Sequence, residues 1–111
     1  MGRPFVFILS FLTFGRLKNK TAIVTGGDSG IGRSAAIMFA REGMSGITIT
    51  YLEEEALDAQ DAKAQIEAAG AKCNLVCVDL AIEANCKKVV ESHLEKFGKL
   101  NVFVNNASTQ K

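Results

Sequence analysis

The stretch Thr25-Gly26-Gly27-Asp28-Ser29-Gly30-Ile31-Gly32 predicts the fold of this chain more directly than any other segment. It follows an apolar run and opens a helical pattern, which is the context of a loop that holds a dinucleotide phosphate. Glycine is needed there to turn the chain sharply off a strand, to let backbone approach the pyrophosphate, and to pack the helix closely on the sheet. The amides at the start of the helix then face the anion.

Length and composition bound the class of protein. The chain has 111 residues, 48% of them hydrophobic, and a net charge of +1. This is enough for one domain with one core. Acidic and basic residues are scattered without a basic stripe, which argues against nucleic acid as a partner and favours a small ligand.

The amino-terminal segment differs from the rest of the chain. Residues 4–14 are almost wholly apolar and lie between Arg3 and Arg16. The run is shorter than the roughly 20 residues of a spanning helix, and no cleavage pattern of small residues follows it. We expect residues 1–16 to be a poorly ordered or mis-assigned extension of a cytoplasmic protein whose folded domain is 17–111. A membrane or secretory role through residues 4–14 is the alternative.

From Leu17 onward, strand and helix patterns alternate, which indicates a parallel sheet with crossover helices. The predicted strands are 21–25, 46–51, 73–78 and 100–104, and the predicted helices are 30–42, 53–69 and 82–97. The fold class is therefore α/β, a Rossmann-like three-layer parallel sheet in truncated form, with four strands in the order 3-2-1-4 and crossover helices.

Hydrophobic spacing predicts which helix faces are buried. In the first helix the buried face contains Ile31, Ala35, Met38 and Phe39. In the third helix residues recur at three and four positions, and the predicted face is Ile82, Cys86, Val89, Val90, His93, Leu94 and Phe97. His93 is thus expected to be packed or hydrogen-bonded rather than catalytic.

The remaining candidates for chemistry have simpler interpretations. Cys73, Cys77 and Cys86 form neither an even disulfide set nor a Cys-x-x-Cys pair, so they are interpreted as reduced, buried residues without a metal or redox role. The acidic run 53–55 is interpreted as a solvated helix start, where negative charge is favourable.

Further downstream, Asp79-Leu80 ends the third strand and Asn105-Asn106-Ala107 ends the fourth. With the spacing Gly-x-x-x-Gly-x-Gly, these elements resemble the short-chain dehydrogenase/reductase family over about residues 15–111. They disfavour both a plain glycine turn and a Rossmann-like methyltransferase. The amino-acid sequences of four stretches are similar to those of the glucose/ribitol dehydrogenase-like branch: Gly-Gly-Asp-Ser-Gly-Ile-Gly-Arg33, Tyr51-Leu-Glu-Glu-Glu, Phe97-Gly-Lys-Leu100 and Asn-Asn-Ala-Ser-Thr-Gln110.

The resemblance implies a set of cofactor-binding residues and no metal. Asp79 would accept a hydrogen bond from the adenine amino group, and the Asn-Asn-Ala element would line the cofactor. Ser108 stands where the family usually has a final glycine. The implied set is Gly26, Asp28, Ser29, Gly30, Ile31, Gly32, Tyr51, Asp79, Leu80, Asn105, Asn106 and Ala107.

The choice between NAD and NADP depends on the residue that ends the second strand, where an acid selects NAD and a nearby Arg accommodates NADP. Tyr51 is neither. Asp28 and the three glutamates after Tyr51 would repel an additional phosphate, which favours NAD. Arg33 is expected to pair with a surface acid rather than with a phosphate.

The family's proton transfer uses a Ser and a Tyr-x-x-x-Lys, whereas this sequence has one tyrosine, Tyr51, followed four residues later by Glu55. No catalytic residue is therefore assigned. The resemblance implies the amino-terminal, cofactor-binding portion of an NAD(P)-dependent oxidoreductase acting on an alcohol or carbonyl compound of sugar or polyol type, which can be a homo-oligomer. A catalytically inactive, truncated nucleotide-binding fragment or isoform is the alternative.

Overall fold

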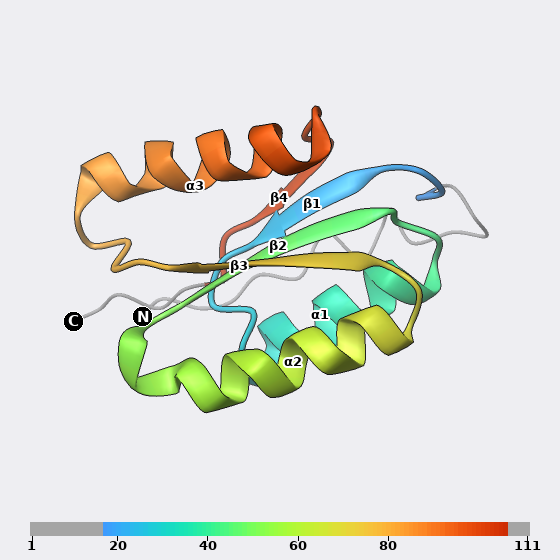
Figure 1. Cartoon of the computed structure of the whole chain (residues 1–111), viewed down its shortest axis with the longest axis horizontal. Helices are drawn as coiled ribbons and strands as arrows, with labels where there is room; N and C mark the ends of the chain where they lie inside the picture. The colour runs from blue at the N-terminus through green and yellow to red at the C-terminus, as the bar shows by residue number, and fades with distance from the viewer. Residues whose placement is uncertain (1–16, 107–111) are drawn as a thin grey trace.

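The sheet consists of four parallel strands in the order β3-β2-β1-β4, as the sequence predicts (Figure 1). The computed structural model describes residues 17–106. The strands are β1 (Thr21–Val24), β2 (Gly46–Tyr51), β3 (Lys72–Cys77) and β4 (Val102–Val104). Because all four run in the same direction, their carboxyl ends meet at one edge of the sheet.

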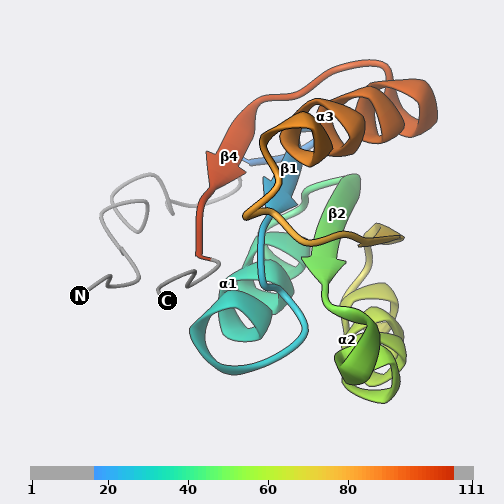
Figure 2. The ribbon, with the colours of Figure 1, turned by 90° about the vertical axis from the view of Figure 1, so that its left-hand side faces the viewer.

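The helices cover both faces of this sheet and make three layers (Figure 2). Helices α1 (Gly30–Arg41) and α2 (Ala56–Ala68) lie on one face, and α3 (Glu83–Phe97) lies on the other (Figure 1). The Rossmann-like α/β class is thereby confirmed.

The main core lies between the sheet and the α1–α2 layer. Strand side chains alternate between the two faces, so Ala22 and Val24 of β1 and Ile47 and Ile49 of β2 point into this core. The helices contribute apolar residues that include Phe39 and Ile66. All residues of β1 are buried, as expected for a strand covered on both faces.

Several predicted boundaries are wrong. Strand β4 begins at Val102 rather than at residue 100. Asn101 explains the difference, because its Oδ1 accepts a hydrogen bond from the Thr21 amide at 3.0 Å while its own amide donates to the Thr21 carbonyl oxygen. Strand β3 is shifted by one residue toward the amino end, and the acidic run 53–55 forms a separate 3-10 turn before α2.

The predicted helix faces are too broad. Ile31 is 51% exposed because it lies at the free first turn of α1. On α3, only Val89 and His93 are buried, while Cys86, Leu94 and the N-cap residue Ile82 are exposed. The buried residues of α3 lie four apart, and the outer members of the predicted face are not covered by a neighbouring element within the described residues.

The prediction that the cysteines are buried holds for one residue of the three. Cys73 is buried, and burial raises the pKa of its thiol to about 12. Cys77 and Cys86 are exposed, contrary to the prediction that all three are buried. Cys77 lies on the same strand as Cys73 but at the carboxyl end of β3.

His93 is buried and joins α3 to two neighbouring strands, β1 and β2. Its Nε2 lies 3.0 Å from Thr21 Oγ1, and its Nδ1 lies 2.7 Å from Thr48 Oγ1. The Thr21 hydroxyl donates its proton to the Lys99 carbonyl oxygen at 2.6 Å, so it must accept from Nε2–H. Nδ1 therefore accepts from the Thr48 hydroxyl, and the network holds the neutral imidazole.

This network leads to a pH prediction. Burial lowers the pKa of His93, against a smaller opposing effect of the Lys99 backbone. In the unfolded chain the imidazole of His93 has a pKa of about 6.5. The contribution of His93 to the free energy of unfolding is therefore complete above that pH. It is lost as pH falls through about 6.5 toward the folded pKa, with a slope of at most about 1.4 kcal/mol per pH unit.

The sequence contains one histidine, so its imidazole NMR signals can be assigned without ambiguity. A pH titration of the folded chain should give a midpoint below that of the same chain in denaturing urea. Equal midpoints would contradict the prediction. Asp28 has the opposite effect, because its pKa is raised in the folded chain and stability therefore increases as pH falls. That effect is confined to the pH interval between the raised pKa of the folded chain and the ordinary carboxyl pKa of 3.8.

No helix within residues 17–106 is long and apolar enough to cross a membrane. The predictions for residues 1–16, for Ala107 and for Ser108 lie outside the described residues.

Candidate cofactor-binding site

The glycine loop, residues 25–32, leaves the carboxyl end of β1 and enters α1 (Figure 1). Its backbone has positive φ angles at Gly26 (66°) and Gly30 (61°), where residues with a Cβ are strained. The Gly26 amide donates to Thr50 Oγ1 on β2 at 3.0 Å. The loop is thus held in a defined shape against the neighbouring strand.

Three glycines of the loop meet different surroundings. A Cβ on Gly27 would lie 2.5 Å from Ile49 Cγ2, and one on Gly32 would lie 2.4 Å from the Gly26 carbonyl oxygen. These two glycines permit close packing of the loop and helix on the sheet. A Cβ on Gly30, by contrast, would meet nothing within 4 Å. The described structure therefore leaves open space next to the Gly30 backbone.

The first turn of α1 is suited to an anion. Ser29 is the N-cap residue, but its side chain makes no capping hydrogen bond, and no acidic residue lies in the first turn. Ser29, Gly30 and Ile31 are all exposed. The amides of a helix start without a side-chain cap are donors for a phosphate, and the helix dipole favours negative charge there.

The end of β4 is tied to the glycine loop. The Asn106 amide donates to Thr25 Oγ1 at 2.8 Å, and Asn106 Nδ2 donates to the Gly26 carbonyl oxygen at 3.3 Å. Thr25 Oγ1 also lies 3.1 Å from Asn105 Oδ1. The two asparagines thus fix the spacing between the loop and the fourth strand.

The other predicted residues lie at the carboxyl ends of the remaining strands. Tyr51 ends β2 opposite Cys77, and burial, together with the neighbouring Cys77 thiol, raises the pKa of its phenol. Asp79 follows β3 and is exposed, and its Oδ1 accepts from the Ala81 amide at 2.9 Å. Leu80 is half-buried beside it.

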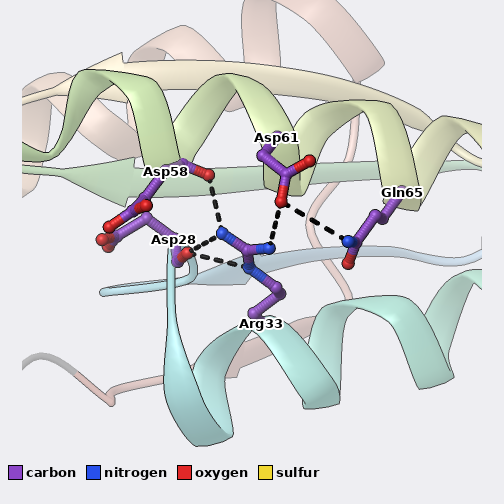
Figure 3. Close-up of polar contacts among 5 residues, drawn as sticks. All are labelled: Asp28, Arg33, Asp58, Asp61 and Gln65. Carbon is purple, nitrogen blue, oxygen red and sulfur yellow. Dashed lines mark hydrogen bonds and ion pairs between the residues drawn. The ribbon is translucent and has the colours of Figure 1, made fainter.

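Arg33 connects the loop to α2, as Figure 3 shows. Its Nε and Nη2 donate to the Asp28 carbonyl oxygen at 2.9 and 2.7 Å, and Nη2 also donates to the Asp58 carbonyl oxygen. Nη1 forms an ion pair with Asp61 at 2.7 Å. The prediction that Arg33 pairs with a surface acid is confirmed.

Asp28 has a buried carboxyl group, with 2% of the residue exposed. Burial raises its pKa, and the nearby acidic side chains of Glu55 and Asp58 raise it further, against its own backbone hydrogen bond. Within residues 17–106 no group of acidic, cysteine or histidine side chains has an arrangement that could hold a metal ion. The acids near Asp28 therefore do not form a metal site.

Residues 20–111 match the family model described as short chain dehydrogenase. The chain belongs to the short-chain dehydrogenase family. Members of this family bind a nicotinamide dinucleotide, NAD or NADP. The chain is 48% identical over 96 residues to the uncharacterized oxidoreductase YhdF of Bacillus subtilis, covering 86% of this chain and 32% of that protein.

Two further comparisons agree with the predicted branch of the short-chain dehydrogenase family. The glucose and ribitol dehydrogenase homolog of Oryza sativa is 41% identical over 115 residues, covering 97% of this chain and 38% of that protein. The apo structure of a Caenorhabditis elegans glucose dehydrogenase superposes with a TM-score of 0.75 at 40% identity, covering 86% of this chain and 40% of that one. The chain thus spans between 32% and 40% of the length of these relatives.

The sequence did not single out every residue that shapes this short-chain dehydrogenase site. Thr50 was predicted only as a strand residue, yet its hydroxyl accepts from the Gly26 amide. Glu55 was interpreted as part of a solvated helix start and Asp58 was not singled out, yet both influence the buried Asp28. The alternation of β2 points Thr50 away from the apolar face and was the one available signal for that residue.

Proposed function

We propose that this chain is the amino-terminal, cofactor-binding portion of an NAD(P)-dependent short-chain oxidoreductase. The substrate of the whole protein is an alcohol or carbonyl compound of sugar or polyol type. The rice and nematode relatives carry glucose or ribitol in their names, which supports this substrate class. The proposal places the protein in the cytoplasm, and a homo-oligomer is compatible with it.

The observation that carries the proposal is the shape of the glycine loop. Open space next to Gly30, an uncapped helix start and exposed loop residues occur together at the carboxyl ends of β1 and β4. In open parallel sheets this edge is where ligands bind. The predicted residues would each serve one part of the dinucleotide: the loop its phosphates, Asp79 and Leu80 the adenine, and Asn105, Asn106 and Ala107 the nicotinamide side.

The cofactor proposed is NAD in preference to NADP. Arg33 is occupied by two carbonyl oxygens and Asp61, so it offers no obvious partner to an additional phosphate. The turn after Tyr51 carries negative charge instead. Both observations support the cofactor that lacks the 2′-phosphate.

Binding without turnover is the expected result for the 111-residue chain. Calorimetric titration with NAD should show saturable binding, because the glycine loop is complete. Assays with NAD or NADP and a panel of alcohols should show no turnover, because the sequence has no Tyr-x-x-x-Lys. The absence of any dinucleotide binding would contradict the proposed function, and dose-dependent turnover would contradict the assignment of Tyr51 as non-catalytic.

A further inference from the structure

The side chain of Arg33 is bound mainly to main-chain oxygens of two other segments. Its Nε and Nη2 atoms both donate to the Asp28 carbonyl oxygen, at 2.9 and 2.7 Å, and Nη2 also donates to the Asp58 carbonyl oxygen at 2.9 Å. Only 19% of the side chain is exposed, against 62% for its ion-pair partner Asp61. The ion pair alone would not require the two bonds to Asp28, which hold one peptide group of the glycine loop.

That peptide group joins Asp28 to Ser29 and is trans, because no cis peptide bond occurs within residues 17–106. In a planar trans peptide the C=O and N–H bonds point in opposite directions. Arg33 holds the Asp28 oxygen toward α2 (Figure 3), so the Ser29 N–H points away from α2. The Ser29 amide has no hydrogen-bond acceptor among the described residues. Arg33 therefore sets the direction of an unused donor at the N-cap of α1.

The same contact keeps the Asp28 oxygen away from the first turn of α1. An oxygen atom close to a helix start readily accepts from the amides that have no partner within the helix. The Asp28 oxygen is already held by two Arg33 donors, and the Ser29 side chain makes no capping hydrogen bond. The amides of Gly30 and Ile31 thus remain without a side-chain cap, beside the open space next to Gly30.

We propose that Arg33 is a positioning residue for the phosphates of the dinucleotide, because its anchoring of the Asp28 carbonyl directs the Ser29 amide and the first turn of α1 toward the bound anion. This inference rests on the proposed function. Arg33 acts from the opposite side of the Asp28–Ser29 peptide and does not itself meet the phosphates. A planar guanidinium can hold the loop carbonyl and α2 at once, which a single ammonium group cannot.

The variant Arg33→Met keeps an unbranched apolar stem and removes the guanidinium. It should raise the NAD dissociation constant about tenfold, because the loop amides lose their fixed direction toward the phosphates. The dissociation constant of adenosine, which has no phosphate, should be unchanged. A residue that only stabilised the fold would weaken both ligands alike. Titrations followed by NMR chemical shifts measure both constants, since they also detect weak binding.

The control is Arg41→Met, which makes the same substitution at an exposed position in the last turn of the same helix. It should retain the parental affinity for both ligands. Arg33→Lys keeps the positive charge but cannot span both carbonyl oxygens, so it should lose NAD affinity in the same direction by a smaller factor. Circular dichroism reports folding, and Arg33→Lys carries the comparison if Arg33→Met is unfolded.

Two results would overturn the inference while the proposed function stands. In the first, the folded Arg33 variants bind NAD as tightly as Arg41→Met does. In the second, they lose NAD and adenosine affinity by the same factor, which would make Arg33 a residue of general stability. If the parent chain binds neither NAD nor NADP, the proposed function and the inference fail together.

Discussion

Replacing His93 with alanine is expected to destabilise the fold by about 3 kcal/mol or more. The side chain is fully buried, so the substitution leaves a cavity, and such large-to-small changes cost about 2–5 kcal/mol. It also removes the acceptor for the Thr48 hydroxyl and the donor to Thr21 Oγ1, and buried groups without partners add to the cost. A typical domain has a total free energy of unfolding of about 5–15 kcal/mol, so the substitution should remove a large fraction of the stability and lower the urea midpoint.

Urea unfolding followed by circular dichroism measures this loss. The variant Lys96→Ala, at an exposed position of the same helix, controls for removing a side chain from α3 and should change stability little. His93→Phe separates the two causes, because it fills the space near Phe97 without restoring either hydrogen bond. A His93→Ala midpoint equal to that of Lys96→Ala would show that the network contributes nothing.

The sequence predicted the order of the strands because two independent patterns agree. The glycine loop requires a strand before it and a helix after it, and the branched run ending in Tyr51 supplies the next strand. Parallel strands joined by helices then have few possible orders. The same reasoning placed Asn105 and Asn106 at the edge that holds the loop, where the structure bonds them to Thr25 and Gly26.

Burial on α3 was not predictable from spacing alone. The apolar residues Ile82, Cys86 and Leu94 fit the helical period as well as Val89 does, yet they are exposed. Helical period identifies a face but not how far the neighbouring layer extends across it. The face that a helix buries depends on the elements packed around it, which its own sequence does not specify.

The surroundings of Asp28 were also hidden from the sequence. The pKa of its carboxyl group is raised by burial and also by Glu55, which lies 27 residues later in the chain. The acidic run looked like an ordinary helix start because local charge preference already explains it. A pairing of two acids is visible only once the segments after β1 and β2 are placed side by side.

Replacing Gly32 with alanine is expected to reduce NAD binding by more than tenfold. The new Cβ would lie 2.4 Å from the Gly26 carbonyl oxygen and 2.6 Å from Asn106 Nδ2. The hydrogen bond between these two groups holds the loop to the end of β4, so the clash must break it or move α1 away from the sheet. Either change displaces the amides at the helix start. The cost in stability should be about 1–3 kcal/mol.

The control for this prediction is Gly98→Ala. Gly98 ends α3 with a φ of 78°, and a Cβ added there would meet nothing within 4 Å. Alanine at this position should therefore lower the free energy of unfolding by about 1 kcal/mol through backbone strain alone. Calorimetric NAD titration and thermal unfolding of both variants separate a local from a general effect. If loop geometry positions the phosphates, Gly32→Ala loses affinity at temperatures where it is still folded, whereas Gly98→Ala retains the parental affinity. Equal affinity in both variants would mean that close packing at Gly32 is not required for binding.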